Sequence, residues 1–405
     1  MARFIAIPVA QGDSFYLERE NLSVLVDGGR NRSAFAAMFQ AITNKNGVDI
    51  VICTHNDADH TEGTVGYLQS GLGCKEVWLP GRWLSVLPDV LKPFVDVFVE
   101  LTDNVLHAVR RLNIVEGQRD RLTIERYSEH LEERVNDISV KHPEELTGEV
   151  IGEDGWTELH AQLLEQAEPW EGSGWLSPWR NGDWDDFFYF RHFRRLPPAA
   201  IQLLFSAIDA ATRIRAIALE AYHRGIPVRW FEYSASKAAG GLPELQPINS
   251  TAIARVRPRS GTLLDFLALT VSNKQSLVFW SPPADQHPGV LFTADSDLAG
   301  CQLPSQFRGA LATAPHHGSE ANAQAYRIVA SAAQQFDSTI TWIRSDGRSR
   351  KRPGSTYLTI RSRRLCTICR CNSSFSTSKQ AVQLFSRHGT WVRHADTSMC
   401  VCQQA

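Results

Sequence analysis

The sequence predicts an α/β fold in which helices cover a β-sheet. Short β-branched and apolar runs alternate along the chain with longer alanine-rich or amphipathic segments, and this alternation is typical of such a fold. Of the 405 residues, 43% are hydrophobic and 21% are charged, which is an ordinary globular composition. A chain of this length can contain one large domain or two of modest size.

Residues 1–95 contain the elements predicted for the first half of the core. A tight turn at Asp27-Gly28-Gly29 ends an N-terminal meander, and glycine supplies the backbone freedom that this turn needs. Pro80-Gly81 stops the last strand of this half. The predicted elements are strands at 3–7, 15–19 and 23–26, a helix at 33–42, and strands at 48–54 and 76–79.

Residues 96–200 are predicted to form a helical, aromatic-rich insertion. Apolar residues at three- and four-residue spacing predict helices at 90–112 and 122–140. Residues 129–171 are strongly acidic, and aromatic residues are dense between Trp170 and Phe193. These aromatics would form a small local core, a lid over a site, or a docking face for a protein partner.

Residues 201–345 are predicted to form the second half of the core. An alanine-rich helix leads into a series of short apolar runs that read as strands. The predicted elements are a helix at 199–223, strands at 227–233, 266–271, 276–280, 290–293 and 311–314, a helix at 321–335, and a strand at 339–343.

Residues 346–405 are predicted to form a basic, cysteine-rich appendage. Its basic residues are either a solvated tail or a phosphate-binding strip, because guanidinium groups fit phosphate oxygens bidentately. Its clustered cysteines, with His388 and His394 between them, suggest a structural zinc site, although five thiols exceed the four that zinc needs and reduced thiols packed without metal are the alternative. The candidate phosphate-binding residues are Arg348, Arg350, Lys351 and Arg352, and the candidate zinc ligands are Cys366, Cys369, Cys371, Cys400 and Cys402.

The most informative stretch follows the predicted strand at 48–54. It reads Thr54-His55-Asn56-Asp57-Ala58-Asp59-His60 and places two imidazoles and two carboxylates within six residues. Two acids so close together need a positive group, and a pair of divalent metal ions would neutralise them best. Three further stretches are distinctive: Gln11-Gly12-Asp13-Ser14, Leu291-Phe292-Thr293-Ala294-Asp295 and Pro315-His316-His317-Gly318-Ser319.

Together these stretches resemble the metallo-β-lactamase superfamily, whose central motif is His-x-His-x-Asp-His. Asp57 stands at the second histidine position, and this variant is similar to the hydrolase domain of bacterial competence (DNA-uptake) proteins. The four stretches occur in the family's order, so the resemblance covers most of residues 1–95 and 225–345. It implies an αββα metallo-β-lactamase sandwich, to which the residue patterns described above add a helical insertion and a Cys-rich C-terminal appendage.

The resemblance also implies a binuclear metal centre. His55 and Asp57 would bind one metal ion, Asp59 and His60 the second, and Asp295 would bridge the two. His316 or His317 would close the second site, and the other would lie near the leaving group or donate a hydrogen bond to the substrate oxyanion. A third histidine for the first metal has no clear match, and Asn273 would occupy that corner or orient the substrate. Two Zn²⁺ ions are expected, with Mn²⁺ as an alternative because oxygen ligands replace nitrogen. The residues expected to act in catalysis are Asp59, His317 and Asn273.

Asp13 and Asp27 would each hold the second ring nitrogen of a metal-binding histidine, or would serve only the turns that contain them. The net charge of −2 makes the whole molecule a poor generic polyanion binder. No apolar run is long enough to span a bilayer, and the N-terminus reads as a strand rather than a signal peptide, so a cytoplasmic protein is expected.

The functional prediction is a metal-dependent hydrolase. It would be a phosphodiesterase or nuclease that cleaves DNA or RNA with a hydroxide held between two metal ions. One alternative is a hydrolase of a small ester, lactone or thioester, which an enclosed apolar pocket would favour. The other is a subunit of a larger complex, in which a protein partner bound to the aromatic insertion gates the site.

Overall fold

The computed structural model describes residues 2–116, 148–168, 170, 198–256, 269, 275–284, 286–335, 339–345, 352–370, 377–398 and 400. Within these residues the fold is mixed α/β, as the sequence predicts. The chain divides into two compact units. Unit 1 contains residues 1–81, 224–253 and 273–405, and unit 2 contains residues 82–223 and 254–272.

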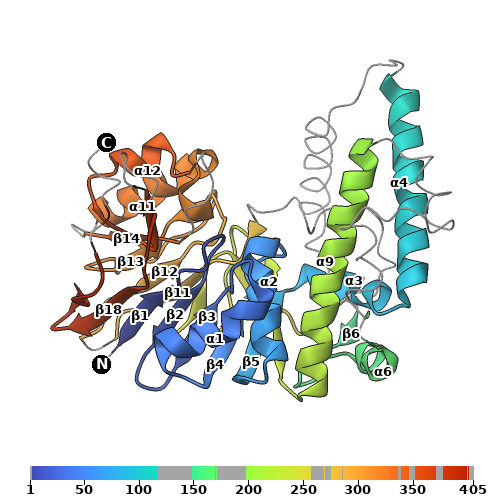
Figure 1. Ribbon diagram of the computed structural model, residues 1–405, viewed down its shortest axis with the longest axis horizontal. Coiled ribbons are helices and arrows are strands. Elements are labelled where there is room, and N and C mark those ends of the chain that lie inside the picture. The colour runs from blue at the N-terminus through green and yellow to red at the C-terminus, as the bar shows by residue number, and fades with distance from the viewer. Residues whose placement is uncertain are drawn as a thin grey trace. The chain divides into compact units, whose positions relative to one another are not determined.

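In the described residues, the larger sheet of unit 1 has nine strands, in the order β19-β18-β1-β2-β3-β4-β5-β7-β9. Figure 1 labels β18 and β1 to β5 of this sheet. Its centre is parallel from β3 to β7, and its two ends are antiparallel. The strands are β1 (Arg3–Ala6), β2 (Phe15–Glu18), β3 (Ser23–Val26), β4 (Gly47–Ile52), β5 (Gly73–Pro80), β7 (Val228–Tyr233), β9 (Ser250–Ala252), β18 (Val382–Arg387) and β19 (Thr390–Arg393).

The second sheet of unit 1 has six strands, in the order β15-β14-β13-β12-β11-β8. Strands β12 to β15 are parallel to one another, so their carboxyl ends lie along one edge. The strands are β8 (Gln246–Pro247), β11 (Phe279–Ser281), β12 (Val290–Phe292), β13 (Leu311–Thr313), β14 (Thr341–Arg344) and β15 (Arg363–Cys366), and a separate hairpin pairs β16 (Ile368–Arg370) with β17 (Thr377–Lys379).

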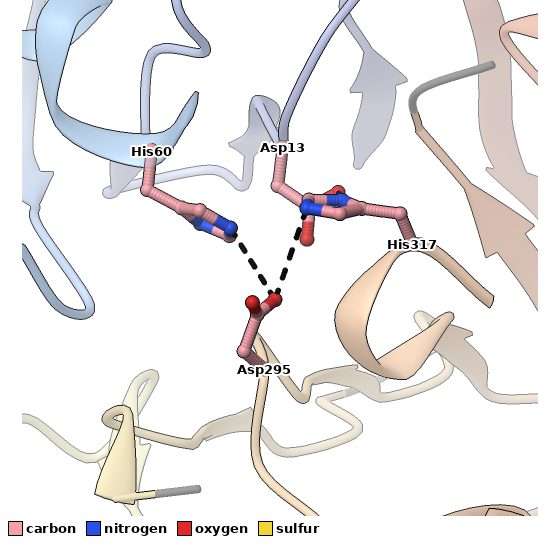
Figure 2. A group of neighbouring side chains, drawn as sticks. All are labelled: Asp13, His60, Asp295 and His317. Carbon is pink, nitrogen blue, oxygen red and sulfur yellow. Dashed lines mark hydrogen bonds and ion pairs between the residues drawn. The ribbon is translucent and has the colours of Figure 1, made fainter. Parts of the chain in front are cut away.

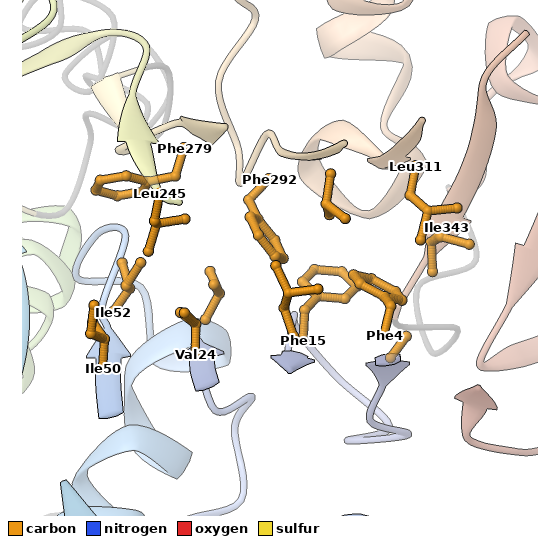
Figure 3. Close-up of a cluster of buried hydrophobic side chains, with 14 of the residues drawn as sticks. Phe4, Phe15, Val24, Ile50, Ile52, Leu245, Phe279, Phe292, Leu311 and Ile343 are labelled. Carbon is orange, nitrogen blue, oxygen red and sulfur yellow. The ribbon is translucent and has the colours of Figure 1, made fainter. Parts of the chain in front are cut away.

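The two sheets share one hydrophobic core. Phe4, Phe15 and Ile52 from the first sheet and Phe292 and Ile343 from the second belong to the same cluster of buried side chains (Figure 3). Because side chains alternate along a strand, neighbouring residues point away from this core toward helices.

Helices cover the outer face of each sheet. On the first sheet, the Tyr16 ring of β2 lies 5.8 Å from Phe39, which in turn lies 5.2 Å from Tyr67. On the second, Trp342 lies 5.0 Å from Tyr326. The helices of unit 1 are α1 (Arg32–Thr43), α2 (Ala58–Gln69), the 3₁₀ turns η2 (Pro315–Gly318) and η3 (Glu320–Asn322), α11 (Ala323–Gln335) and α12 (Ser355–Thr359).

Unit 2 is mainly helical in the residues described. Helix α9 packs against α3, α4 and α6, and Arg215 of α9 stacks on the Trp170 ring at 4.9 Å and donates to the Val90 carbonyl at 2.6 Å. The elements are α3 (Arg82–Val90), α4 (Phe94–Glu116), α6 (Glu158–Gln166), α9 (Pro198–His223) and a two-stranded ribbon of β6 (Glu149–Val150) and β10 (Arg255–Val256). Trp170 therefore packs locally, whereas the remaining predicted aromatic segment at 171–193 lies outside the described residues.

Several predicted elements differ in the structure. The helix expected at 90–112 begins only at Phe94 and runs to Glu116, because Pro93 disfavours a helical conformation at the residue before it, and Val90 instead ends α3. The described residues after 345 form no separate appendage: β15 extends the second sheet, and β18 lies beside β1 in the first. The alternating burial of 382–387 explains why this segment forms a core strand.

The predicted helix at 122–140, and the strand at 266–271 apart from Leu269, lie outside the described residues. Among the described helices, none has both the length and the hydropathy that a membrane span requires.

Candidate metal centre

Four loops of unit 1 bring acidic and imidazole side chains together. His55 and Asp57 follow β4, and Asp59 and His60 lie in the first turn of α2. Asp13 comes from the β1–β2 connection. Asp295 follows β12, while His316 and His317 follow β13, so strand ends from both sheets supply the cluster.

The backbone conformation is unusual at Gly12 and at His316-His317, and at both places it allows groups of the cluster to lie close together. Gly12 has a φ of +93°, and a Cβ there would lie 1.5 Å from the carbonyl oxygen of Asp59. His316 and His317 have φ values of 45° and 54°, a left-handed conformation that is costly for residues other than glycine. This turn places both imidazoles near Asp295 instead of on opposite sides of the chain.

Each histidine of the cluster is held by its Nδ1 atom. His60 Nδ1 donates to Asp27 Oδ2 at 2.8 Å, and His317 Nδ1 donates to Asp13 Oδ1 at 2.9 Å. His316 Nδ1 donates to Asn322 Oδ1 at 3.1 Å. Fixing one ring nitrogen in this way orients the other, and metal-binding histidines in proteins are commonly held by such partners.

His55 is held through a relay. Its Nδ1 atom lies 3.0 Å from Thr54 Oγ1, and that hydroxyl donates to Asp27 Oδ2 at 2.7 Å. The Thr54 backbone N–H also donates to Asp27 at 2.9 Å. Asp27 therefore orients two histidines at once, one directly and one through a threonine.

The Nε2 atoms of the four histidines all face the carboxylate of Asp295. His55 and His316 lie 3.6 and 3.5 Å from Asp295 Oδ2. His60 and His317 lie 3.3 and 3.9 Å from Oδ1, and Figure 2 shows these two imidazoles pointing toward Asp295. The two oxygens of one buried carboxylate thus face two different pairs of histidines.

Two more carboxylates, those of Asp57 and Asp59, lie near one histidine of each pair. Asp57 Oδ2 lies 3.8 Å from His55 Nε2, and Asp59 Oδ2 lies 3.4 Å from His317 Nε2. Among the described residues, two groups could each hold a metal ion, because within each group the donor atoms all lie within 4.8 Å of one another. They are Asp13, His60, Asp295 and His317, and His55, Asp57 and Asp295.

Among the residues that the structure describes, four buried polar atoms that face one another here have no hydrogen-bond partner. They are the Nε2 atoms of His55, His60 and His317 and the Oδ1 atom of Asp295. A buried polar atom without a partner typically costs about 1–3 kcal/mol. Here the four converge on one place, and imidazole nitrogen with carboxylate oxygen is a donor set suited to Zn²⁺ or Mn²⁺. The residues therefore fit a divalent metal ion.

The electrostatics of the cluster lead to the same conclusion. Burial opposes a charge on Asp295, but the positive charge of neighbouring imidazoles, His60 foremost, outweighs burial and holds the pKa of Asp295 well below its usual range. Burial also opposes a charge on His317, yet Asp13 and Asp295 raise its pKa to about 10. The buried carboxylates are therefore stable in their charged form because positive charge lies nearby, and either protons on the imidazoles or a bound cation can supply that charge.

The structure brings together most of the predicted site residues. His55, Asp57, Asp59, His60, Asp295, His316 and His317 lie in this one cluster. His317 lies with Asp59 and His60, whereas His316 and His55 both face Asp295 Oδ2. Asn273 lies outside the described residues.

The C-terminal candidates are only partly described. Arg352 lies in the cluster, with its Nη2 atom 2.5 Å from His316 Nε2, while Arg348, Arg350 and Lys351 lie outside the described residues. Cys366 and Cys400 are buried with their sulfur atoms 3.0 Å apart. Cys371 and Cys402 lie outside the described residues, as does the side chain of Cys369.

Sequence reasoning missed two residues that orient the cluster. Thr54 holds His55, and Asn322 joins His316 to the Asp295 loop by donating to the Asp295 carbonyl at 2.8 Å. Thr54 was detectable as a hydroxyl directly before the motif. Asn322 had no such signal, because its role depends on the left-handed turn at His316.

Comparisons with known proteins do not place this chain in a family. No protein-family model matches the sequence, and no curated protein matches it at a significant level.

Proposed function

We propose that this protein is a metal-dependent phosphodiesterase that cleaves DNA or RNA, built on a metallo-β-lactamase-type αββα sandwich in unit 1. One observation carries the proposal: four histidines, each held at Nδ1, direct Nε2 toward the two oxygens of one buried aspartate. This arrangement suits two cations that share a bridging carboxylate.

The layering of unit 1 supports the fold assignment. Two sheets pack through a common core and carry helices on their outer faces, and the candidate ligands follow strand ends in the order that the family resemblance implies. In the described residues, β18 and β19 extend the first sheet at one end, and β15 extends the second.

The residues divide into two ligand sets. His55, Asp57 and His316 would hold one cation, and Asp59, His60 and His317 the other, with Asp295 common to both. His316 would then take the corner that the sequence leaves open on the first side. A bound pair of divalent cations would supply Lewis acidity and lower the pKa of a water molecule toward neutrality.

The chain's own groups keep this site rigid and charged. Asp13 and Asp27 fix the imidazoles, and both carboxylates are 1% exposed, so water competes little for these hydrogen bonds. The Arg352 guanidinium lies at the edge of the cluster and favours an anionic substrate such as a phosphodiester over a neutral ester.

The test is hydrolysis of labelled single- and double-stranded DNA and RNA by full-length protein supplied with Zn²⁺ or Mn²⁺. We expect Asp59→Asn to lower the rate by about 10²-fold or more, because it removes one anionic ligand without changing side-chain volume. The matched control, Asp396→Asn, alters an exposed carboxylate of the same unit and should retain the wild-type rate. Intact polynucleotides, together with cleavage of a small ester by the same preparation, would contradict the proposal.

A further inference from the structure

The hydrogen bond between Arg352 and His316 is the least expected contact of the cluster. His316 Nδ1 is engaged by Asn322, so Nε2 carries the lone pair and accepts from the Arg352 guanidinium at 2.5 Å. That same lone pair is the one that a cation on the His55 side would use. A cation and Arg352 therefore compete for a single nitrogen atom.

The backbone fixes Arg352 in this position. The Gly354 N–H donates to the Gly318 carbonyl at 2.8 Å, which ties the chain after Arg352 to the turn that carries His316. Glu320 accepts hydrogen bonds from the Thr356 N–H at 2.8 Å and from its hydroxyl at 2.6 Å. These two anchors hold the segment that directly follows Arg352 against the turn that carries His316.

The charge of the guanidinium also explains the placement. His316 Nε2 and Asp295 Oδ2 lie 3.5 Å apart, and a lone pair facing a carboxylate oxygen at that distance is repulsive without a positive group nearby. Arg352 supplies that positive charge. A divalent cation on this side would supply it instead and would repel Arg352.

We propose that Arg352 exchanges partners: it binds His316 before the cation on the His55 side is loaded, and it binds an anionic phosphoryl oxygen of the substrate afterwards. This inference rests on the proposed function and deepens it, because it makes loading of one cation depend on a phosphate-bearing ligand. A phosphate group would offset the repulsion between guanidinium and cation and would occupy the donors that His316 releases. Cation and phosphate should consequently strengthen each other's binding by the same factor.

The experiment is calorimetric titration of Mn²⁺ into metal-stripped full-length protein, with and without millimolar inorganic phosphate. Without phosphate, we expect Arg352→Gln to bind Mn²⁺ about tenfold more tightly than wild type in the weaker site, the scale of one hydrogen bond to a charged group. Phosphate should tighten wild-type binding by about tenfold and Arg352→Gln binding by less than about twofold. The control Arg361→Gln, at an exposed arginine, should match wild type in both titrations.

A double-mutant cycle tests whether Arg352 affects cation binding through His316 Nε2. In a His316→Asn background, the gain from Arg352→Gln should disappear, because the contested nitrogen is gone. Asparagine tolerates the left-handed conformation of residue 316, so the turn can persist.

Unchanged or weaker Mn²⁺ binding by Arg352→Gln, or equal phosphate coupling in both proteins, would overturn this inference and leave the proposed function standing. The expected titrations without polynucleotide cleavage would overturn the nuclease function alone. Failure of both proteins to bind Mn²⁺ would overturn the two together.

Discussion

Replacing Asp295 with asparagine is expected to abolish binding of the second cation and to lower hydrolysis by about a thousandfold. Asp295 is 1% exposed, and its two oxygens face opposite pairs of histidines. Asparagine keeps the side-chain volume but loses the negative charge, and its amide nitrogen cannot act as a ligand. A neutral group at this point therefore cannot bridge two cations.

The fold around residue 295 should survive this change. The Asp295 N–H donates to Ser276 Oγ at 3.0 Å, and its carbonyl accepts from Asn322, so backbone groups hold the loop. Circular dichroism verifies the fold, and metal analysis with a cleavage assay measures the effect. The control is Asp297→Asn in the same loop, which should keep the metal content of wild type. Full metal content in Asp295→Asn would show that Asp295 is not a shared ligand.

Replacing Gly28 with alanine is expected to destabilise unit 1 by about 3 kcal/mol or more. A Cβ at residue 28 would lie 2.2 Å from the Thr64 nitrogen and 2.3 Å from the Gly63 carbonyl carbon. These are backbone atoms of α2, whose first turn carries Asp59 and His60, so a rotamer change cannot relieve the clash. The β3–α1 turn and the helix must separate, which would also break the 2.8 Å hydrogen bond from the Gly28 N–H to the His60 carbonyl.

Chemical denaturation of both variants measures this effect. The control is Gly73→Ala, where the nearest atom to a new Cβ would lie 3.5 Å away, an ordinary contact. It should change the free energy of unfolding by less than about 1 kcal/mol. Equal stability of Gly28→Ala and Gly73→Ala would mean that the turn does not approach α2 as closely as the structure shows.

Most of the α/β framework of unit 1 was predictable from local pattern. The segments that form β3, β4, β12 and β13 are β-branched or apolar runs bounded by turn residues, and hydrophobic periodicity identifies such runs without tertiary information. The C-terminal strands were not predictable in this way. Val382 and Leu384 alternate with polar residues, but the partner of that strand, β1, lies at the other end of the chain.

The residues of the candidate site were likewise predictable only in part. His55, Asp57, Asp59 and His60 were found because they are close in sequence and follow a strand. The separate positions of His316 and His317 could not be predicted, because they depend on two consecutive left-handed residues. The contact between Arg352 and His316 likewise depends on the backbone pairing of Gly354 with Gly318.

Anomalous X-ray diffraction from crystals of the Zn²⁺-loaded full-length protein would test the binuclear centre most directly. We expect two zinc peaks, one beside each oxygen of Asp295, with His60 and His317 at one and His55 and His316 at the other. Absence of any peak at Asp295 from fully loaded crystals would contradict it.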